Sequence, residues 1–145
     1  MEMALHLIKL CVGCESISDL EDWIIEKRRR TRGKKTEHIH VTRMVPTRAA
    51  ELLAGGSLYW VIRGEIACRQ RLIDIRPFVD KEGIRRCKLV LEPKVVPVLP
   101  RPRGPFQGWR YFAAGETPPD LNKHGRGLVR LPEELRRELR ELGLL

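Results

Sequence analysis

Runs of apolar residues, some unbroken and some alternating with polar positions, mark out the expected elements of this chain. Five segments have the period of two or the short apolar run that predicts a β-strand, at residues 5–11, 38–44, 57–63, 65–75 and 85–91. Helical spacing appears at Leu20, Trp23 and Ile24 and again along Leu131–Leu142. The order of these segments predicts an α+β domain with one antiparallel sheet, curled into a small β-barrel, and helices packed on its outside.

The expected helices have recognisable ends. Ser18 and Glu21 have the spacing of a capping box, so the first helix is expected to begin at Ser18 and to run into a basic cluster. Pro46-Thr47 opens a second, short helix that Gly55-Gly56 ends. The third helix is expected near the C-terminus, where a Pro-Glu-Glu start and a leucine stripe predict an amphipathic helix that docks on the sheet.

Alternation also assigns side chains to the two faces of the expected strands. In residues 65–75, the positions of Cys68 and Gln70 point to the core, whereas Arg69 and Arg71 point away from it. Cys87 is expected on the core face of the following strand. An arginine pair on an outward face is either a solvated surface or a second place for binding.

Three connecting segments stand out by composition. Residues 27–37 form a basic helix end and loop, residues 93–105 contain five prolines, and residues 115–127 are rich in glycine, proline and charge. The prolines allow at most an edge strand around Val95–Leu99, because proline has no backbone N–H for a central strand. We expect residues 1–145 to form a single domain.

Positive charge is concentrated in two parts of the chain. The 145 residues carry 28 Lys and Arg against 19 Asp and Glu, a formal net charge of +9. Eleven of these cations lie in two stretches without a carboxylate, residues 27–35 and 94–110. Such local basicity on a near-neutral body predicts a contact surface for a polyanion, and the alternative is a solvated, flexible loop.

Aromatic residues overlap the second basic stretch. Four of the eight aromatics lie within residues 106–112. Cations that hold phosphates and rings that stack on unpaired bases are the usual means of binding single-stranded RNA, although these rings could instead plug one end of the barrel. The residues expected to contact nucleic acid are Lys27, Arg28, Arg29, Arg30, Arg32, Lys34, Lys35, Arg101, Arg103, Trp109, Arg110 and Tyr111.

The four cysteines come without a secretory signal, which predicts thiols in a reducing cytoplasm. Cys11 and Cys14 form a C-x-x-C, and a strand at residues 38–42 would place His38 and His40 on one face, so these four side chains are candidate zinc ligands. The spacing of a zinc finger is missing, however. The preferred interpretation is that the cysteines pack as small apolar residues and that the chain holds no metal or other cofactor.

Two further classes of function are alternatives to nucleic-acid binding. Thr42 and Arg43 end a strand ahead of a helix, where they could cradle a phosphate or carboxylate of a nucleotide substrate. An enzyme is nevertheless the second choice, because the chain has no G-x-S-x-G, Walker A or H-E-x-x-H motif. A protein-interaction factor that uses Leu131–Leu145 is the third. No membrane partner is expected, since no apolar run reaches the roughly 18 to 20 residues of a membrane span.

Three stretches carry a resemblance to a known family: His40-Val-Thr-Arg-Met44, Leu53-Ala-Gly-Gly-Ser-Leu-Tyr-Trp-Val-Ile62 and Pro105-Phe-Gln-Gly-Trp-Arg-Tyr111. Over nearly its whole length the chain resembles a bacterial family known only as a domain of unknown function, which implies no activity. Residues 39–112 are also similar in architecture to the PUA-like barrels, including the ASCH and EVE domains. That resemblance implies binding of RNA or of modified bases.

Departures from the PUA-like pattern limit what the resemblance implies. ASCH-type domains carry a lysine, a glutamate and an arginine after the helix-ending glycine, whereas here only Arg63 could stand in for the arginine, so their lysine-dependent hydrolysis is not expected. Trp60 could supply a wall of an EVE-type base cage, together with Trp109 and Tyr111. The candidate ligand pocket is therefore Thr42, Arg43, Trp60 and Arg63. The sequence as a whole predicts a non-catalytic RNA-binding or modified-base-binding module.

Overall fold

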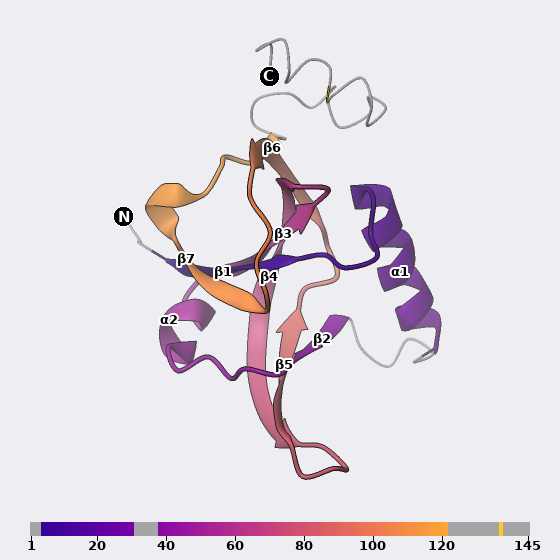
Figure 1. Cartoon of the computed structure of the whole chain (residues 1–145), viewed down its shortest axis with the longest axis vertical. Helices are drawn as coiled ribbons and strands as arrows, with labels where there is room; N and C mark the ends of the chain where they lie inside the picture. The colour runs from indigo at the N-terminus through magenta and orange to yellow at the C-terminus, as the bar shows by residue number, and fades with distance from the viewer. Residues whose placement is uncertain (1–3, 31–37, 122–136, 138–145) are drawn as a thin grey trace.

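A computed structural model of the chain describes residues 4–30, 38–121 and 137. Figure 1 shows the strands crossing the middle of the molecule, with α1 at the right of the view and α2 at the lower left. None of the described helices is long and apolar enough to cross a membrane. The helix expected over Leu131–Leu142 lies outside the described residues, apart from position 137. The elements are β1 (Leu5–Leu10), α1 (Ile17–Arg30), β2 (His38–Thr42), α2 (Ala49–Leu53), β3 (Ser57–Ile62), β4 (Glu65–Val79), β5 (Arg85–Leu91), β6 (Val96–Pro102), β7 (Trp109–Ala113) and a 3₁₀ turn (Ala114–Glu116).

The strands form one mixed sheet. Its order is β2-β5-β4-β3-β1-β7, and β6 pairs with β4 beside this path. β1 and β3 run parallel, with Leu7 opposite Leu58, whereas the other pairs are antiparallel. The prediction of a purely antiparallel sheet is therefore wrong for β1 and β3. The reason lies in the connection, because α1, β2 and α2 intervene and return the chain to the end at which β1 began.

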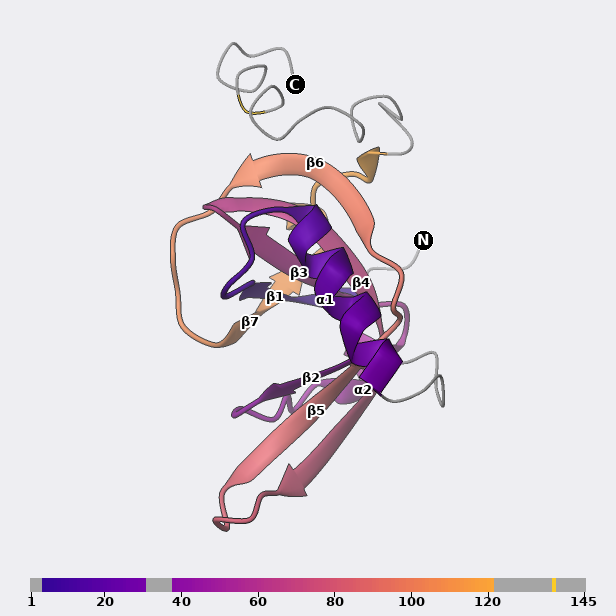
Figure 2. The same ribbon diagram turned by 90° about the vertical axis from the view of Figure 1, so that its right-hand side faces the viewer.

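The long strand β4 divides the sheet into two parts. Its first residues pair with β3 and β6, and its residues after a bulge at Leu72 and Asp74 pair with β5. Figure 2 shows the consequence: β5 and the second part of β4 leave the curled part of the sheet and extend away from it.

The curled part does not close into the predicted barrel. The segment after β7 meets β6 through one isolated bridge, Val98 to Asp120, and one hydrogen bond from the Leu99 N–H to the Pro119 carbonyl at 2.8 Å. Four residues at this seam are prolines, at positions 97, 100, 118 and 119, and none of them has an N–H to donate. A continuous ladder cannot form there, so the sheet stays open.

Strand β3 is buried along its whole length because each of its faces contacts a separate apolar core. Leu58 and Trp60 pack with Leu7, α1 and α2 in the larger core, on what we call the inner face of the sheet. Tyr59 and Val61 pack with Ile8 and β6 in the smaller core, on the outer face. The predicted core positions Cys68 and Cys87 are confirmed, since both are fully buried on the inner face.

The residue that caps α1 lies two positions before the predicted one, and the helix begins at Ile17. The Ser16 hydroxyl accepts a hydrogen bond from the Asp19 N–H at 3.1 Å, and Asp19 Oδ2 accepts one from the Glu15 N–H at 2.9 Å. This reciprocal pair caps the helix, and the expected pair, Ser18 and Glu21, is wrong. Sequence spacing alone did not distinguish two overlapping Ser-x-x-acid patterns.

The second helix ends at a close approach of two backbones. A Cβ atom at Gly56 would lie 2.2 Å from the Leu5 carbonyl oxygen and 2.4 Å from that of Leu52. Only glycine lets α2 turn into β3 against β1 in this way. This contact brings the start of β3 next to the start of β1, where the pocket described below is formed.

Candidate functional site

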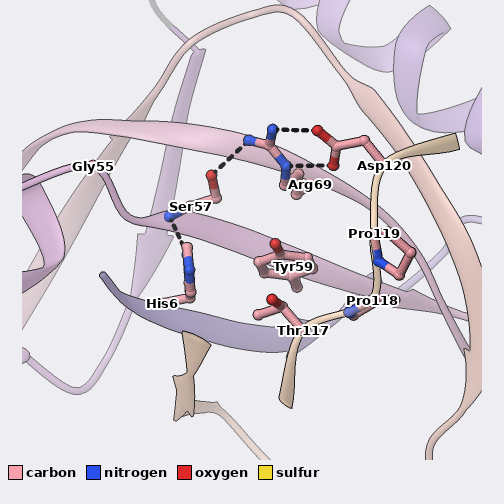
Figure 3. A pocket seen from close by; sticks show the side chains of 9 residues that line it. All are labelled: His6, Gly55, Ser57, Tyr59, Arg69, Thr117, Pro118, Pro119 and Asp120. Carbon is pink, nitrogen blue, oxygen red and sulfur yellow. Dashed lines mark hydrogen bonds and ion pairs between the residues drawn. The ribbon is translucent and has the colours of Figure 1, made fainter. Parts of the chain in front are cut away.

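A pocket of about 380 Å³ opens at the end of the curled sheet where β1 and β3 begin. Figure 3 shows His6 from β1, Ser57 and Tyr59 from β3, Arg69 from β4 and Asp120 from the segment after β7 around one space. His6, Tyr59 and Arg69 come together because they occupy outward positions on three neighbouring strands. Gly55, Thr117, Pro118 and Pro119 complete the lining.

Arg69 is the centre of this pocket. Its Nε and Nη2 donate to the two carboxylate oxygens of Asp120 at 2.9 and 2.7 Å, and its Nη1 donates to the Ser57 hydroxyl at 3.0 Å. The hydrogen bonds to Asp120 raise the pKa of Arg69. A guanidinium has five N–H donors, so two remain for a ligand. Asp120 and Ser57 therefore hold the Arg69 guanidinium in a fixed orientation, and Arg69 can still donate hydrogen bonds to a ligand.

His6 is neutral in this arrangement. Its Nδ1 accepts the Ser57 backbone N–H at 2.9 Å, which places the ring proton on Nε2. Burial, and then the positive charge of Arg69, lower the pKa of His6. The Ser57 hydroxyl is bonded to a guanidinium and not to the imidazole, so the two side chains do not form a base and nucleophile pair.

A second pocket, of about 420 Å³, shares Gly55, Ser57 and Arg69 with the first. Arg71 and Lys94 line it and are both exposed, and Glu92 is the one carboxylate among its lining residues. This pocket therefore carries more positive than negative charge. Tyr59 lines the first pocket on the other side of Arg69, and burial raises the pKa of its hydroxyl.

Two of the arginines predicted to contact nucleic acid lie near one aromatic ring. The guanidinium carbons of Arg103 and Arg110 lie 5.2 and 5.5 Å from the centre of the Phe106 ring. Arg101 is exposed and donates to the Glu116 carbonyl. We call Arg101, Arg103, Phe106 and Arg110 the arginine edge.

The two predicted stacking residues are used inside the protein. Trp109 is 5% exposed and donates from Nε1 to the Met44 carbonyl at 2.8 Å. The Tyr111 hydroxyl accepts the N–H groups of Thr47 and Arg48 at 3.0 and 3.2 Å. Both rings thus anchor the connection between β2 and α2, and in strand β7 they face away from Arg110 as alternation requires.

The first basic stretch falls mostly outside the described part of the chain. Lys27 donates to the Ile39 carbonyl at 3.2 Å and lies 4.3 Å from the centre of the Trp23 ring. Arg29 is exposed on α1. The side chains of Arg28 and Arg30, and residues Arg32, Lys34 and Lys35, lie outside the described residues.

The four residues of the predicted ligand pocket lie on different elements. Thr42 is buried and donates to the Met44 carbonyl at 2.9 Å, and Trp60 is buried and donates to Gln70 Oε1 at 2.9 Å. Arg43 is exposed, and Arg63 is exposed in a turn with a positive φ of 52°. None of the four lines the two pockets that meet at Arg69.

The candidate zinc ligands are arranged differently from a metal site. The described residues contain no group of three or more His, Cys, Asp and Glu side chains placed to hold a metal ion. Cys11 and Cys14 are free thiols, and burial raises the pKa of Cys11. His38 Nδ1 lies 3.2 Å from Gln70 Nε2, and the Nε2 atoms of His38 and His40 are buried without a partner in the described structure.

The fold and these sites define a small mixed α/β protein with a polar pocket and an arginine-rich edge. The chain belongs to the family described as protein of unknown function DUF1489, whose model matches residues 7–145. No curated protein and no solved structure matches the chain.

Sequence reasoning missed most of the pocket. Its polar residues come from four segments, at position 6, positions 57 and 59, position 69, and positions 117 and 120, and no local spacing connects these segments. The one available signal was alternation, which put Arg69 and Arg71 on the outward face of their strand. Asp120 follows two prolines in a segment without periodicity, so nothing identified it as the partner of Arg69.

Proposed function

We propose that this protein is a non-catalytic module that binds single-stranded nucleic acid, with RNA as the expected partner, through the arginine edge. The observation that carries the proposal is that two guanidinium groups converge on the Phe106 ring. Stacking on a ring orients a guanidinium and leaves its N–H groups free for phosphate oxygens.

The charges around the arginine edge support the same function. Among the described residues, no carboxylate forms an ion pair with Arg101, Arg103 or Arg110. Arg63 lies near these arginines. Its neighbour in the sequence, Gly64, accepts a hydrogen bond at its carbonyl from the Arg103 N–H at 2.8 Å. The net charge of +9 adds a general attraction for a polyanion.

The finer architectural hypothesis is a PUA-like domain. Its support is the helix ending at Gly55-Gly56, the two-residue turn between β3 and β4, and the proline-rich β6 beside β4. Because the seam between β6 and the segment after β7 is open, the proposal concerns a PUA-like order of elements and not a closed barrel.

The test is fluorescence anisotropy of a labelled single-stranded RNA at several salt concentrations. Replacing both Arg103 and Arg110 by alanine is expected to weaken binding and to lower the slope of log K against log salt by about 0.7 for each lost phosphate contact. Arg85→Ala, at an exposed position of β5, is the matched control. Equal affinity and slope for the double variant and the control would contradict the proposal.

A further inference from the structure

The two pockets that meet at Arg69 differ in charge although they share a wall. In the first pocket the positive charge of Arg69 is balanced by Asp120, and the other polar groups, from His6, Tyr59 and Thr117, are neutral. In the second, Arg71 and Lys94 face one carboxylate, that of Glu92. A ligand that fills both would need a neutral polar body and a single anionic end.

We propose that these pockets form one binding site for a nucleotide, with the base in the first pocket and the phosphate in the second. Each pocket, at about 380 and 420 Å³, lies in the range of roughly 300–1,000 Å³ that is typical of small-molecule sites. This site is distinct from the arginine edge, and the inference does not rest on the proposed function.

The first pocket suits a planar group that both donates and accepts hydrogen bonds. Asp120 supplies carboxylate oxygens, and the Tyr59 hydroxyl can donate or accept. The Thr117 hydroxyl donates to the Ala114 carbonyl at 2.8 Å and can accept a hydrogen bond from a ligand. Figure 3 shows these side chains on the same side of the strands as Pro119, whose exposed ring offers an apolar contact. A nucleobase has this combination of flat faces and a hydrogen-bonding edge.

The second pocket suits a phosphate. Arg71 and Lys94 are exposed and, in the described structure, no ion pair occupies them. Arg69 lines both pockets and has two N–H groups left, so it can donate hydrogen bonds to a ligand that fills both. Charge-assisted hydrogen bonds to phosphate are the stronger kind, so this half should supply most of the affinity.

The test is isothermal titration calorimetry with the four ribonucleoside 5′-monophosphates, the matching nucleosides and inorganic phosphate. At least one nucleotide is expected to bind. The matching nucleoside and inorganic phosphate should each bind at least about tenfold more weakly than that nucleotide. Replacing Arg71 and Lys94 by alanine should weaken the nucleotide about tenfold or more and leave the nucleoside unchanged. Tyr59→Phe, which keeps the ring, should weaken the binding of both the nucleotide and the nucleoside. Arg85→Ala should change the affinity of neither ligand.

Three outcomes would overturn the inference: none of the nucleotides binds, inorganic phosphate binds as tightly as the nucleotide, or the Arg71/Lys94 double variant binds the nucleotide as tightly as the wild type. Oligonucleotide binding that depends on Arg103 and Arg110 would survive all three, so failure here is distinguishable from failure of the proposed function. Competition by 5′-phosphorylated against unphosphorylated RNA then separates a strand end from a free nucleotide as the source of the ligand.

Discussion

On the inner face of the sheet, Gln70 joins three elements: its Oε1 accepts from Trp60, and its Nε2 donates to the Glu92 carbonyl at 2.8 Å and faces His38. On the outer face, the neighbouring residue Arg69 joins β3 to the segment after β7 through Ser57 and Asp120. The inner group is sealed from solvent, whereas the outer one lines two pockets.

The difference teaches what each group can do. A buried polar group keeps its hydrogen-bond partners only while the fold is intact. A buried polar atom without a protein partner cannot bond to water instead, and His38 Nε2 and His40 Nε2 are such atoms in the described structure. A polar group beside a pocket can exchange a protein partner for water or a ligand. The inner face should therefore control stability and its pH dependence, and the outer face should control binding.

Acid should give the largest effect, and it should act through the inner face. Burial, with a further contribution from the positive charge of Lys27, lowers the pKa of His38 to about 4, and burial lowers that of His40 to about 3. Between these values and the unfolded pKa of about 6.5, the unfolded chain binds more protons than the folded one, so stability falls as the pH falls. For His38 alone the loss is about 3 kcal/mol by pH 4.

Urea unfolding between pH 7.5 and 4 measures this loss, and an NMR titration of the imidazole protons assigns it. His38→Asn should be less stable than wild type at pH 7.5 and yet lose less stability on acidification. Titration of His38 and His40 close to pH 6.5 would show that the inner face is not sealed, and the comparison of the two faces would then fail.

Replacing Gln70, which contacts Trp60, His38 and the Glu92 carbonyl on the inner face, should have the next largest effect on stability. Gln70→Leu has a similar volume but leaves the buried Trp60 N–H and the part-buried Glu92 carbonyl without this partner. Unsatisfied buried groups cost about 1–3 kcal/mol each, so we expect a loss of about 3 kcal/mol in the free energy of unfolding. A double-mutant cycle with Trp60→Phe checks the cause, because simple additivity of the two losses would mean that the hydrogen bond contributes nothing.

The sequence predicted the elements of both faces better than their contacts. Strand β5 has its predicted bounds, Arg85–Leu91, because apolar alternation between two turns marks a strand locally. Gln70 was assigned to the core face by the same period, and it is fully buried. Its pairing with Trp60 and His38 depends on which strands lie side by side, and alternation carries no information on that order.

The candidate site was harder to predict for the same reason. The aromatic residues Trp109 and Tyr111 were expected on the binding surface from their closeness to arginines in sequence. In the structure, Trp109 and Tyr111 hold the connection before α2, and Phe106, which was not singled out, is the ring close to Arg103 and Arg110. Sequence distance placed the rings and the arginines in one segment, and the fold decided which ring meets which cation.

The smallest effect on stability is expected from the outer face. Asp120→Asn weakens the partner of Arg69, whose side chain is 25% exposed against 19% for Asp120. Because water can enter the pocket and take over part of the lost interaction, we expect a loss of about 1–2 kcal/mol, below that of Gln70→Leu. The affinity for the nucleotide should fall by more than this loss of stability, since Arg69 is no longer held in place.

Thermal unfolding measures the change in stability of Asp120→Asn, and calorimetry measures its nucleotide affinity. Glu51→Gln, in the exposed pair with Arg48, is a control expected to change neither quantity. A stability loss equal to that of Gln70→Leu would mean that the pocket is sealed like the inner face, which would remove the physical basis for assigning binding to it.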